Sequence, residues 1–578
     1  MSKKDRGVTW RLWVVVGVLG IGLLIVTGRL AQLQVLDHDQ YRQQARLMHM
    51  SEETLFDRRG ALLDRNGYPL AASEDTFDVL VERRAWEDPE RAARGAAELS
   101  AITAVQAERM VQEVGGSEIF EISVARNLNY EQATAVKDLG LRGVRLVKSS
   151  HRVYPEGNLA AQVLGFVGRD NVGLTGLEAD LDATLGGSTG VLQFERDGLG
   201  NQFALAPSNL TAPVPGANVI LTIDRYIQRL AEQELERTIS ENKATGGTIV
   251  VVHPATGEIL AMASRPTFDI TKLDLADESK IALYRNRAVT DMYEPGSVFK
   301  LITTAAGLDT GVVGPNTWWY DSGALSVSGW TIRNWDLSAN GSLTVQQMLS
   351  KSLNTGAAWV AHEVGEDAFY RYVDSFGFGR PTGIGVTGDS PGRVRTPEND
   401  PENWRPVDMA TNSFGQGISV TPLQLVMALA AIANDGMGMK PKLVKEIAYP
   451  GGTQVVPAEQ TGQIISPLSA QTLQQMMGVV ADGYSTAYLN VKGYDVGGKT
   501  GTANLTEGAG YKKDAYISSF VGIAPLENPQ LAVLVKIDEP KDLPWGTVVA
   551  APAFSRLVQQ ALAYMEVPPQ DAALVSAP

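Results

Sequence analysis

The sequence predicts an α+β protein, in which helices bracket an antiparallel sheet, behind one N-terminal membrane helix. Three observations lead to this prediction. An uncharged apolar stretch, residues 12–28, follows a basic N-terminus. Amphipathic helical patterns begin and end the C-terminal half, and strand patterns joined by turns lie between them. At 578 residues the chain is too long for one core, so we expect two or more domains.

The N-terminal stretch is predicted to be a retained membrane anchor. Residues 12–28 carry no charge and are just long enough to span a bilayer as a helix. Before them stand basic residues that the positive-inside rule keeps in the cytoplasm: Lys3, Lys4, Arg6 and Arg11. No small-x-small cleavage site follows the stretch. We therefore expect a single-pass protein of the cell inner (plasma) membrane, with residues 1–11 cytoplasmic and the chain after about residue 30 extracytoplasmic.

The rest of the chain divides by pattern. Residues 29–225 mix short strand patterns with charged helical stretches and are predicted to form a separate domain. A second domain, 226–566, begins with an amphipathic helix, continues with strands at 248–252 and 258–264, and ends with a helix whose apolar face runs from Phe554 to Met565. Residues 567–578 contain three prolines and no periodicity, so they are predicted to be a loose tail.

Composition excludes several classes of function. The net charge of −15 argues against nucleic acid as a partner. The chain has no cysteine, which excludes disulfides and thiol catalysis. Its 5 histidines are scattered and form no H-E-x-x-H pair, which argues against a zinc site.

Two chemistries compete for the sequence GKTGT at residues 498–502. Read back to Gly493, it fits a phosphate-binding loop, with Asp538 as the acid that would hold magnesium. A phosphate loop must open a helix, but glycine and β-branched residues follow Lys499. The apolar runs at 516–524 and 531–537 are joined by a proline-bounded turn and predict a hairpin. We therefore expect Lys499 on an antiparallel strand, which disfavours a nucleotide site.

Two upstream motifs favour acyl-transfer chemistry instead. Ser297 and Lys300 are three apart, so on a helix they share a face and the amine can reach the hydroxyl. A lysine can deprotonate a serine only if burial or a nearby cation lowers its pKa, and Lys499 is the natural second cation. Ser352 and Asn354 are predicted to form the opposite wall. Backbone N–H groups of Ser297 and Thr502 would stabilise the developing oxyanion. In this order the motifs are typical of penicillin-interacting serine acyltransferases, whose signatures are S-x-x-K, S-D-N and K-T-G.

The chain resembles the class B penicillin-binding proteins, which are monofunctional peptidoglycan D,D-transpeptidases. Beyond the three signatures, the resemblance extends over most of the chain through segments 59–67, 152–155, 165–168, 173–178, 256–262 and 414–417. The sequence YEPGS at 293–297 is more similar to the division-specific, FtsI-type branch than to the elongation branch. The resemblance implies a penicillin-binding transpeptidase domain with an additional helical subdomain, carried on an elongated α+β pedestal of the dimerisation type.

The resemblance also implies the reaction and the roles of the site residues, and it implies no metal and no cofactor. Ser297 would attack the penultimate D-alanine of a stem peptide, release the terminal D-alanine and pass the acyl group to a neighbouring stem peptide; β-lactams would acylate the same serine. Lys300 would be the base, and Ser352 with Asn354 would relay protons and orient the acyl chain. The segment formed by Lys499, Thr500, Gly501 and Thr502 would bind the terminal carboxylate. The sequence has Leu353 where the signature has Asp, and only the two outer positions need to face the site.

Other functions compatible with these motifs remain open at this stage. A β-lactamase or penicillin sensor shares the signatures but needs no pedestal behind an anchor. A bifunctional enzyme would need a glycosyltransferase domain, of which the pedestal sequence shows no sign. Family analogy implies a scaffold role in which the anchor and pedestal activate a membrane-embedded glycan polymerase of the SEDS type. It also implies divisome or elongasome proteins as partners.

Overall fold

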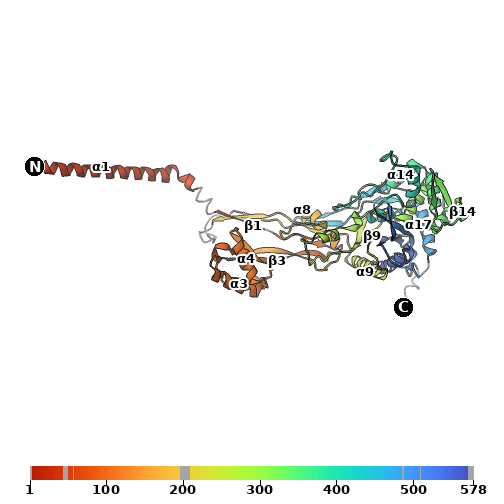
Figure 1. Cartoon of the computed structure of the whole chain (residues 1–578), viewed down its shortest axis with the longest axis horizontal. Coiled ribbons are helices and arrows are strands. Elements are labelled where there is room, and N and C mark those ends of the chain that lie inside the picture. The colour runs from red at the N-terminus through yellow and green to blue at the C-terminus, as the bar shows by residue number, and fades with distance from the viewer. Residues whose placement is uncertain are drawn as a thin grey trace. The chain divides into compact units, whose positions relative to one another are not determined.

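The computed structural model describes residues 3–42, 50–55, 57–195, 209–484, 487–507 and 510–570. The chain divides into two compact units (Figure 1). One comprises Met1–Asp57 and Gly187–Pro215, and the other comprises Arg58–Gly186 and Gly216–Pro578. The predicted sites all lie in the second unit.

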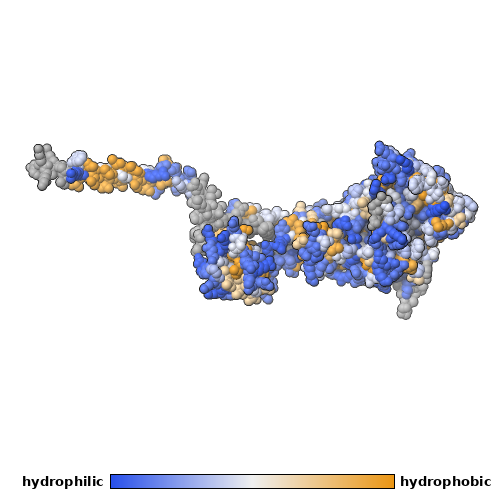
Figure 2. Space-filling model, in the orientation of Figure 1, coloured by the Kyte–Doolittle hydropathy of each residue, from blue (hydrophilic) through white to orange (hydrophobic). Residues whose placement is uncertain are grey.

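The first unit contains the N-terminal helix α1 (Lys3–Ala31), which continues into a short π-helix, η1 (Gln32–Leu36). The stretch Trp10–Leu36 is long and apolar enough to cross a membrane and is not buried by the rest of the protein. Figure 2 shows a hydrophobic surface along the middle of this helix, with hydrophilic residues at either end. The predicted anchor, residues 12–28, lies within this helix. The unit also contains an antiparallel sheet of β1 (Met50–Leu55), β6 (Gly190–Glu195) and β7 (Asn209–Thr211).

A sheet of seven strands forms the N-terminal part of the second unit. Its strands come from β2 (Leu62–Leu63), β3 (Pro69–Glu82), β4 (Glu121–Leu128), β5 (Val144–Val153), β8 (Asn218–Leu221), β16 (Val444–Tyr449) and β17 (Gly452–Val455). The last two strands lie more than two hundred residues after the others in sequence, yet β16 pairs directly with β8. A separate small core, which includes Trp86, Leu99 and Met110, lies where helices cover this sheet. The helices of this region are η2 (Arg83–Trp86), α3 (Pro89–Thr103), α4 (Ala107–Gly116), α5 (Tyr130–Asp138), α6 (Ala161–Leu164), α7 (Gly176–Asp180) and α8 (Asp182–Leu185).

A buried ionic cluster joins segments of this region that are far apart in sequence. Glu178 is fully buried and accepts hydrogen bonds from Arg59 Nε and Arg152 Nε, both at 2.7 Å. Arg59 also donates to Asp182 at 2.6 Å. Because buried charges are tolerated only when paired, the cluster fixes the chain around residue 59 against α7.

The second sheet forms the centre of the C-terminal part of the second unit. Its five antiparallel strands run in the order β10 (Glu258–Arg265), β9 (Gly246–His253), β21 (Leu531–Asp538), β20 (Gly510–Ala524) and β19 (Gly497–Glu507). The expected hairpin is confirmed as β20 and β21, and β19 is a free edge.

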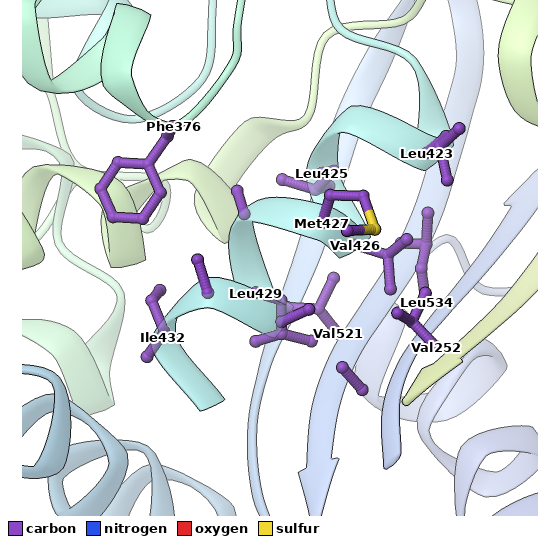
Figure 3. Close-up of a cluster of buried hydrophobic side chains, with 14 of the residues drawn as sticks. Val252, Phe376, Leu423, Leu425, Val426, Met427, Leu429, Ile432, Val521 and Leu534 are labelled. Carbon is purple, nitrogen blue, oxygen red and sulfur yellow. The ribbon is translucent and has the colours of Figure 1, made fainter. Parts of the chain in front are cut away.

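Helices cover both faces of this sheet, which confirms the predicted α+β class. Alternate strand residues such as Ile249 and Val251 pack with α9 (Arg225–Glu241) and α19 (Ala551–Tyr564). Val252, Val521 and Leu534 face α16 (Pro422–Ala433) on the other side (Figure 3). With apolar layers on both faces, the sheet is a rigid platform for residues on its edge.

A helical subdomain packs against the platform. It contains α11 (Lys300–Asp309), α12 (Val345–Lys351), α13 (Asn354–Val364), α14 (Glu366–Ser375), α15 (Pro406–Asn412) and α17 (Pro467–Asp482). Three two-stranded antiparallel sheets lie around it: β11 (Trp318–Asp321) with β14 (Gly341–Thr344), β12 (Ala324–Val327) with β13 (Trp330–Arg333), and β15 (Met437–Met439) with β18 (Gln460–Gln463). The remaining short helices are η3 (Glu278–Leu283), α10 (Arg287–Thr290), η4 (Gly296–Phe299) and α18 (Gly546–Val549).

The predicted tail begins with anchored residues. Tyr494 OH donates to the Val567 carbonyl at 2.6 Å, and Asp495 N donates to Gln570 Oε1 at 2.7 Å. Residues 571–578 of that tail, like residues 1–2 of the predicted cytoplasmic tail, lie outside the described part of the chain.

Glu178→Gln is expected to destabilise the protein by about 3–5 kcal/mol, because it leaves two buried guanidinium groups without their shared carboxylate. The measurement is the free energy of unfolding from urea denaturation of the full-length protein in detergent. The control is Glu113→Ala, which removes an exposed partner of Arg109 and should cost about 1 kcal/mol or less. Equal effects of the two substitutions would contradict a stabilising role for the buried cluster.

Candidate active site

The turn that carries Ser297 is held by close backbone contacts. Ser297 lies in η4, a single turn of 3₁₀ helix that continues directly into α11, whose first residue is Lys300. Gly296 N donates to the Gly415 carbonyl at 3.0 Å. A Cβ on Gly415 would lie 2.2 Å from the Gly296 oxygen, and the φ of Gly415 is +80°, so only glycine fits there. Gly415 thus serves backbone geometry at the turn that carries Ser297.

Lys300 is the centre of the cluster. Its amine is fully buried and lies 3.1 Å from Ser297 Oγ. It also donates to the Ser352 carbonyl at 2.5 Å and to Asn354 Oδ1 at 2.8 Å. Burial, together with the nearby charge of Lys499, holds the pKa of Lys300 well below its usual range. The amine is therefore placed and tuned to take a proton from Ser297.

Ser352 and Asn354 reach the cluster because of a sharp backbone reversal between two helices. Ser352 ends α12 in the left-handed region, with φ of +57°, and Asn354 begins α13. Leu353 between them is buried and points away from the cluster's polar groups. Ser352 Oγ lies 3.3 Å from Lys300 Nζ and 3.0 Å from Lys499 Nζ, so it bridges the two amines. The leucine in place of aspartate leaves this bridge intact.

Lys499 approaches from the edge strand β19. Its side chain is almost fully buried, and besides Ser352 its amine contacts the Thr500 carbonyl at 3.2 Å. Burial lowers the pKa of Lys499 to about 7. Lys499 thus loses its proton far more readily than an exposed lysine, and when charged it opposes protonation of Lys300.

The free edge of β19 faces the turn of Ser297. Thr500 N donates to Tyr484 OH at 3.3 Å, so this N–H points away from the neighbouring strand β20. Alternate residues of an antiparallel strand have the same orientation, so the N–H and C=O of Thr502 also face the open edge. A Cβ on Gly296 would lie 3.1 Å from the Thr502 oxygen, which agrees with this direction. The Thr502 N–H is therefore directed toward the position expected of an oxyanion donor.

Gly501 allows the strand and the turn to meet. A Cβ at this position would lie 2.5 Å from Ser519 Oγ and 2.7 Å from Val298 Cγ2. Such distances are far inside van der Waals contact. Gly501 thus contributes by its lack of a side chain, which lets β19 lie against η4.

A buried carboxylate that the sequence analysis missed supports the wall of Asn354. Asp321 accepts hydrogen bonds from Asn334 Nδ2 at 2.9 Å, Asn340 Nδ2 at 2.8 Å and Thr355 Oγ1 at 2.9 Å. Burial acts to raise the pKa of Asp321, but these donors outweigh it and lower that pKa. Asp321 lies 34 positions before its helical partner Thr355 in sequence, and no motif marks it.

Two exposed tryptophans lie beside the site and were also missed. The rings of Trp335 and Trp545 meet edge to face with centroids 5.7 Å apart. Trp335 Nε1 donates to the Lys351 carbonyl, next to Ser352, at 3.3 Å. Trp545 follows Pro544, whose carbonyl accepts the Thr502 hydroxyl at 3.4 Å. The pair thus links the two walls on either side of the catalytic cluster.

The structure contradicts the phosphate-loop hypothesis. Lys499 is followed by strand residues to Glu507 and not by a helix N-terminus. Asp538 is an ion-pair partner of Lys536 within its own strand. Neither element of a nucleotide site is therefore in place.

Family comparisons agree with this geometry. The model of the penicillin-binding protein transpeptidase domain matches residues 247–559, and that of the penicillin-binding protein dimerisation domain matches residues 57–221. The chain belongs to the class B penicillin-binding proteins. The second match lies within residues 29–225, the predicted pedestal.

Individual relatives extend over nearly the whole of this penicillin-binding protein. It is 34% identical to stage V sporulation protein D of Bacillus subtilis over 558 residues, covering 95% of this chain and 85% of the relative. It is 30% identical to the peptidoglycan D,D-transpeptidase FtsI of Escherichia coli, covering 97% of this chain and 93% of that relative. Penicillin-binding protein 2X of Streptococcus thermophilus superposes with a TM-score of 0.75 at 25% identity, covering 89% and 80%. Penicillin-binding protein 3 of Mycobacterium tuberculosis, complexed with aztreonam, superposes with a TM-score of 0.69 at 27% identity, covering 91% of this chain and 100% of that structure.

Lys499→Met is expected to shift the acidic limb of the pH profile for acylation to higher pH. Removing the neighbouring cation removes the repulsion that opposes protonation of Lys300, so the pKa of Lys300 rises and the free amine forms only at higher pH. The measurement is the rate of acylation by fluorescent penicillin from acidic to alkaline pH. Lys513→Met, which removes an exposed cation on strand β20, is the control. A limb that stays in place or moves to lower pH would contradict the coupling of the two lysines.

Proposed function

We propose that this penicillin-binding protein is a peptidoglycan D,D-transpeptidase in which Ser297 is the nucleophile and Lys300 is its base. The observation that carries the proposal is the fully buried Lys300 amine 3.1 Å from Ser297 Oγ. A lysine with a strongly lowered pKa can accept the serine proton at neutral pH.

The acylation step follows from the cluster. Ser297 Oγ attacks the carbonyl carbon of the penultimate D-alanine of a stem peptide while its proton moves to Lys300 Nζ. The oxyanion that forms accepts hydrogen bonds from the Ser297 and Thr502 N–H groups. Ser352, which contacts both lysines, passes a proton to the leaving nitrogen, and the bond to the terminal D-alanine breaks. The product is an acyl-enzyme on Ser297 and free D-alanine.

Deacylation uses the same groups in reverse. The amine of a neighbouring stem peptide attacks the ester carbonyl, gives its proton to the cluster and forms the new amide as Ser297 leaves with a proton. The result is a cross-link between two stem peptides. If water replaced the amine, the same acyl-enzyme would be hydrolysed, as in D-alanyl-D-alanine carboxypeptidase chemistry.

The remaining site residues bind and orient the substrate. Asn354 holds Lys300 through its oxygen and donates one N–H to the Arg333 carbonyl at 3.1 Å, which leaves its second N–H for the acyl chain. Lys499, with the hydroxyls of Thr500 and Thr502, would bind the terminal carboxylate of the stem peptide. β-Lactams present a reactive amide and a carboxylate at a similar spacing, so we propose that they acylate Ser297. The aztreonam and ampicillin complexes of the mycobacterial relative support this part of the proposal.

The proposal also covers the setting of the enzyme. The helix that contains Trp10–Leu36 fits a single-pass anchor. With the N-terminus in the cytoplasm, the transpeptidase part would face the extracytoplasmic side, where peptidoglycan is assembled. We propose a role in division, supported by the match to FtsI and by the sequence of 293–297, with elongation as the alternative. A membrane-embedded glycan polymerase of the SEDS type and divisome proteins are the partners expected from family likeness.

Ser297→Ala is expected to abolish covalent labelling by fluorescent penicillin, because it removes the hydroxyl that we propose Lys300 activates at 3.1 Å. The measurement combines in-gel fluorescence with mass spectrometry of the labelled peptide. The matched control is Ser350→Ala, which removes an exposed hydroxyl on helix α12. A persistent adduct in the Ser297→Ala protein, or an adduct mapped to another residue of the folded wild type, would refute the assignment of the nucleophile.

A further inference from the structure

Tyr484 contacts the strand that binds the substrate carboxylate, although it belongs to no signature motif. It lies just after helix α17, and its N donates to the Ala481 carbonyl at 3.0 Å. Its ring packs edge to face against Phe520 of β20, with centroids 6.3 Å apart. The hydroxyl lies 3.0 Å from Thr500 Oγ1 and accepts a hydrogen bond from Thr500 N at 3.3 Å. Tyr484 thus holds both the backbone and the side chain of Thr500.

The directions of these hydrogen bonds follow from the chemistry of a phenol. A tyrosine hydroxyl has one proton to donate. Its oxygen already accepts from Thr500 N–H, and within the described residues its other polar neighbour is Thr500 Oγ1. Either oxygen could donate in the contact between the two hydroxyls, but donation from Tyr484 gives the phenol proton an acceptor and leaves the Thr500 proton for another partner. Thr500 is partly exposed, so that partner can be a ligand beside β19.

We propose that Tyr484 is a positioning residue that makes the Thr500 hydroxyl a fixed hydrogen-bond donor to the terminal carboxylate of the acyl donor. This inference rests on the proposed role of Thr500. A carboxylate can only accept hydrogen bonds, so a hydroxyl that is held as a donor binds it without first reorienting. Tyr484 would thereby contribute to the choice of acyl donors that end in a free carboxylate.

The hydroxyl of Thr502 is hydrogen-bonded differently from that of Thr500. It donates to the Pro544 carbonyl at 3.4 Å and accepts from Gly546 N at 3.3 Å. The Thr502 proton is therefore directed at the protein, and this hydroxyl must turn before it can donate to a carboxylate. The Thr500 hydroxyl needs no such turn.

The environment keeps Tyr484 in the form that this arrangement needs. Burial raises the pKa of the Tyr484 phenol, and this effect outweighs the hydrogen-bond contacts with the Thr500 hydroxyl and N–H, which lower that pKa. A phenolate would instead accept the Thr500 proton and turn the lone pairs of that hydroxyl toward the substrate. The neutral phenol persists at the pH where Lys300 acts as a base, so the donor direction is maintained.

The test compares a ligand that has the carboxylate with one that lacks it. The second-order rate constant for acylation of the full-length protein in detergent is measured with benzylpenicillin and with its methyl ester. Tyr484→Phe keeps the ring against Phe520 and removes only the hydroxyl. We expect a loss of about fivefold with benzylpenicillin, the size of one hydrogen bond, and no change with the ester. Thr500→Val should show the same selectivity, and the double variant should add no further loss.

The matched control is Tyr494→Phe, which removes a hydroxyl that bonds the Val567 carbonyl outside the site; both ligands should then react as with the wild type. An equal loss with both ligands in Tyr484→Phe would mark a general structural role and overturn the inference. Selectivity in Thr500→Val without selectivity in Tyr484→Phe would also overturn it, while leaving the role of Thr500 intact. No selectivity in either variant would refute the proposed role of Thr500 itself.

Discussion

The burial of two lysines around one serine hydroxyl is the constraint on which the rest of the site depends. Lys300 and Lys499 both contact Ser352 Oγ and are almost completely removed from water. Burial disfavours the charged form of both amines, so both pKa values are lowered. The same burial that disfavours the charged lysine leaves Lys300 more readily as a free amine. A free amine can accept the Ser297 proton, which is the role that we propose for Lys300.

Such a cluster needs rigid supports, and each support has an identifiable origin. Lys499 belongs to a strand whose sheet is covered by helices on both faces. Lys300 begins a helix whose preceding turn is held by backbone contact with Gly415. The wall of Asn354 is braced by Asp321 through Thr355. Because Gly501 has no side chain, the strand and the turn can approach closely enough for the amines to share Ser352.

Much of the site could be predicted from the sequence because its residues come in short, regular motifs. The spacing of Ser297 and Lys300 on one helical face and the hairpin that placed Lys499 on a strand are both local features. Tyr484 and Asp321 could not be predicted in this way. Each acts on a residue in another element, and its partner is fixed by tertiary packing rather than by spacing. The joining of β16 to the N-terminal sheet is likewise a long-range pairing that periodicity cannot reveal.

Lys300 must be able to act as a neutral amine if it is to take the proton of Ser297. Its pKa can be measured directly by NMR titration of the protein with isotope-labelled lysine side chains, with the Lys300 resonance assigned from a Lys300→Arg variant. We expect a pKa well below the usual lysine value of about 10.4, because the amine is buried beside Lys499. A Lys300 that titrates near the usual value would contradict its proposed role as the base, because a protonated amine cannot take the proton of Ser297.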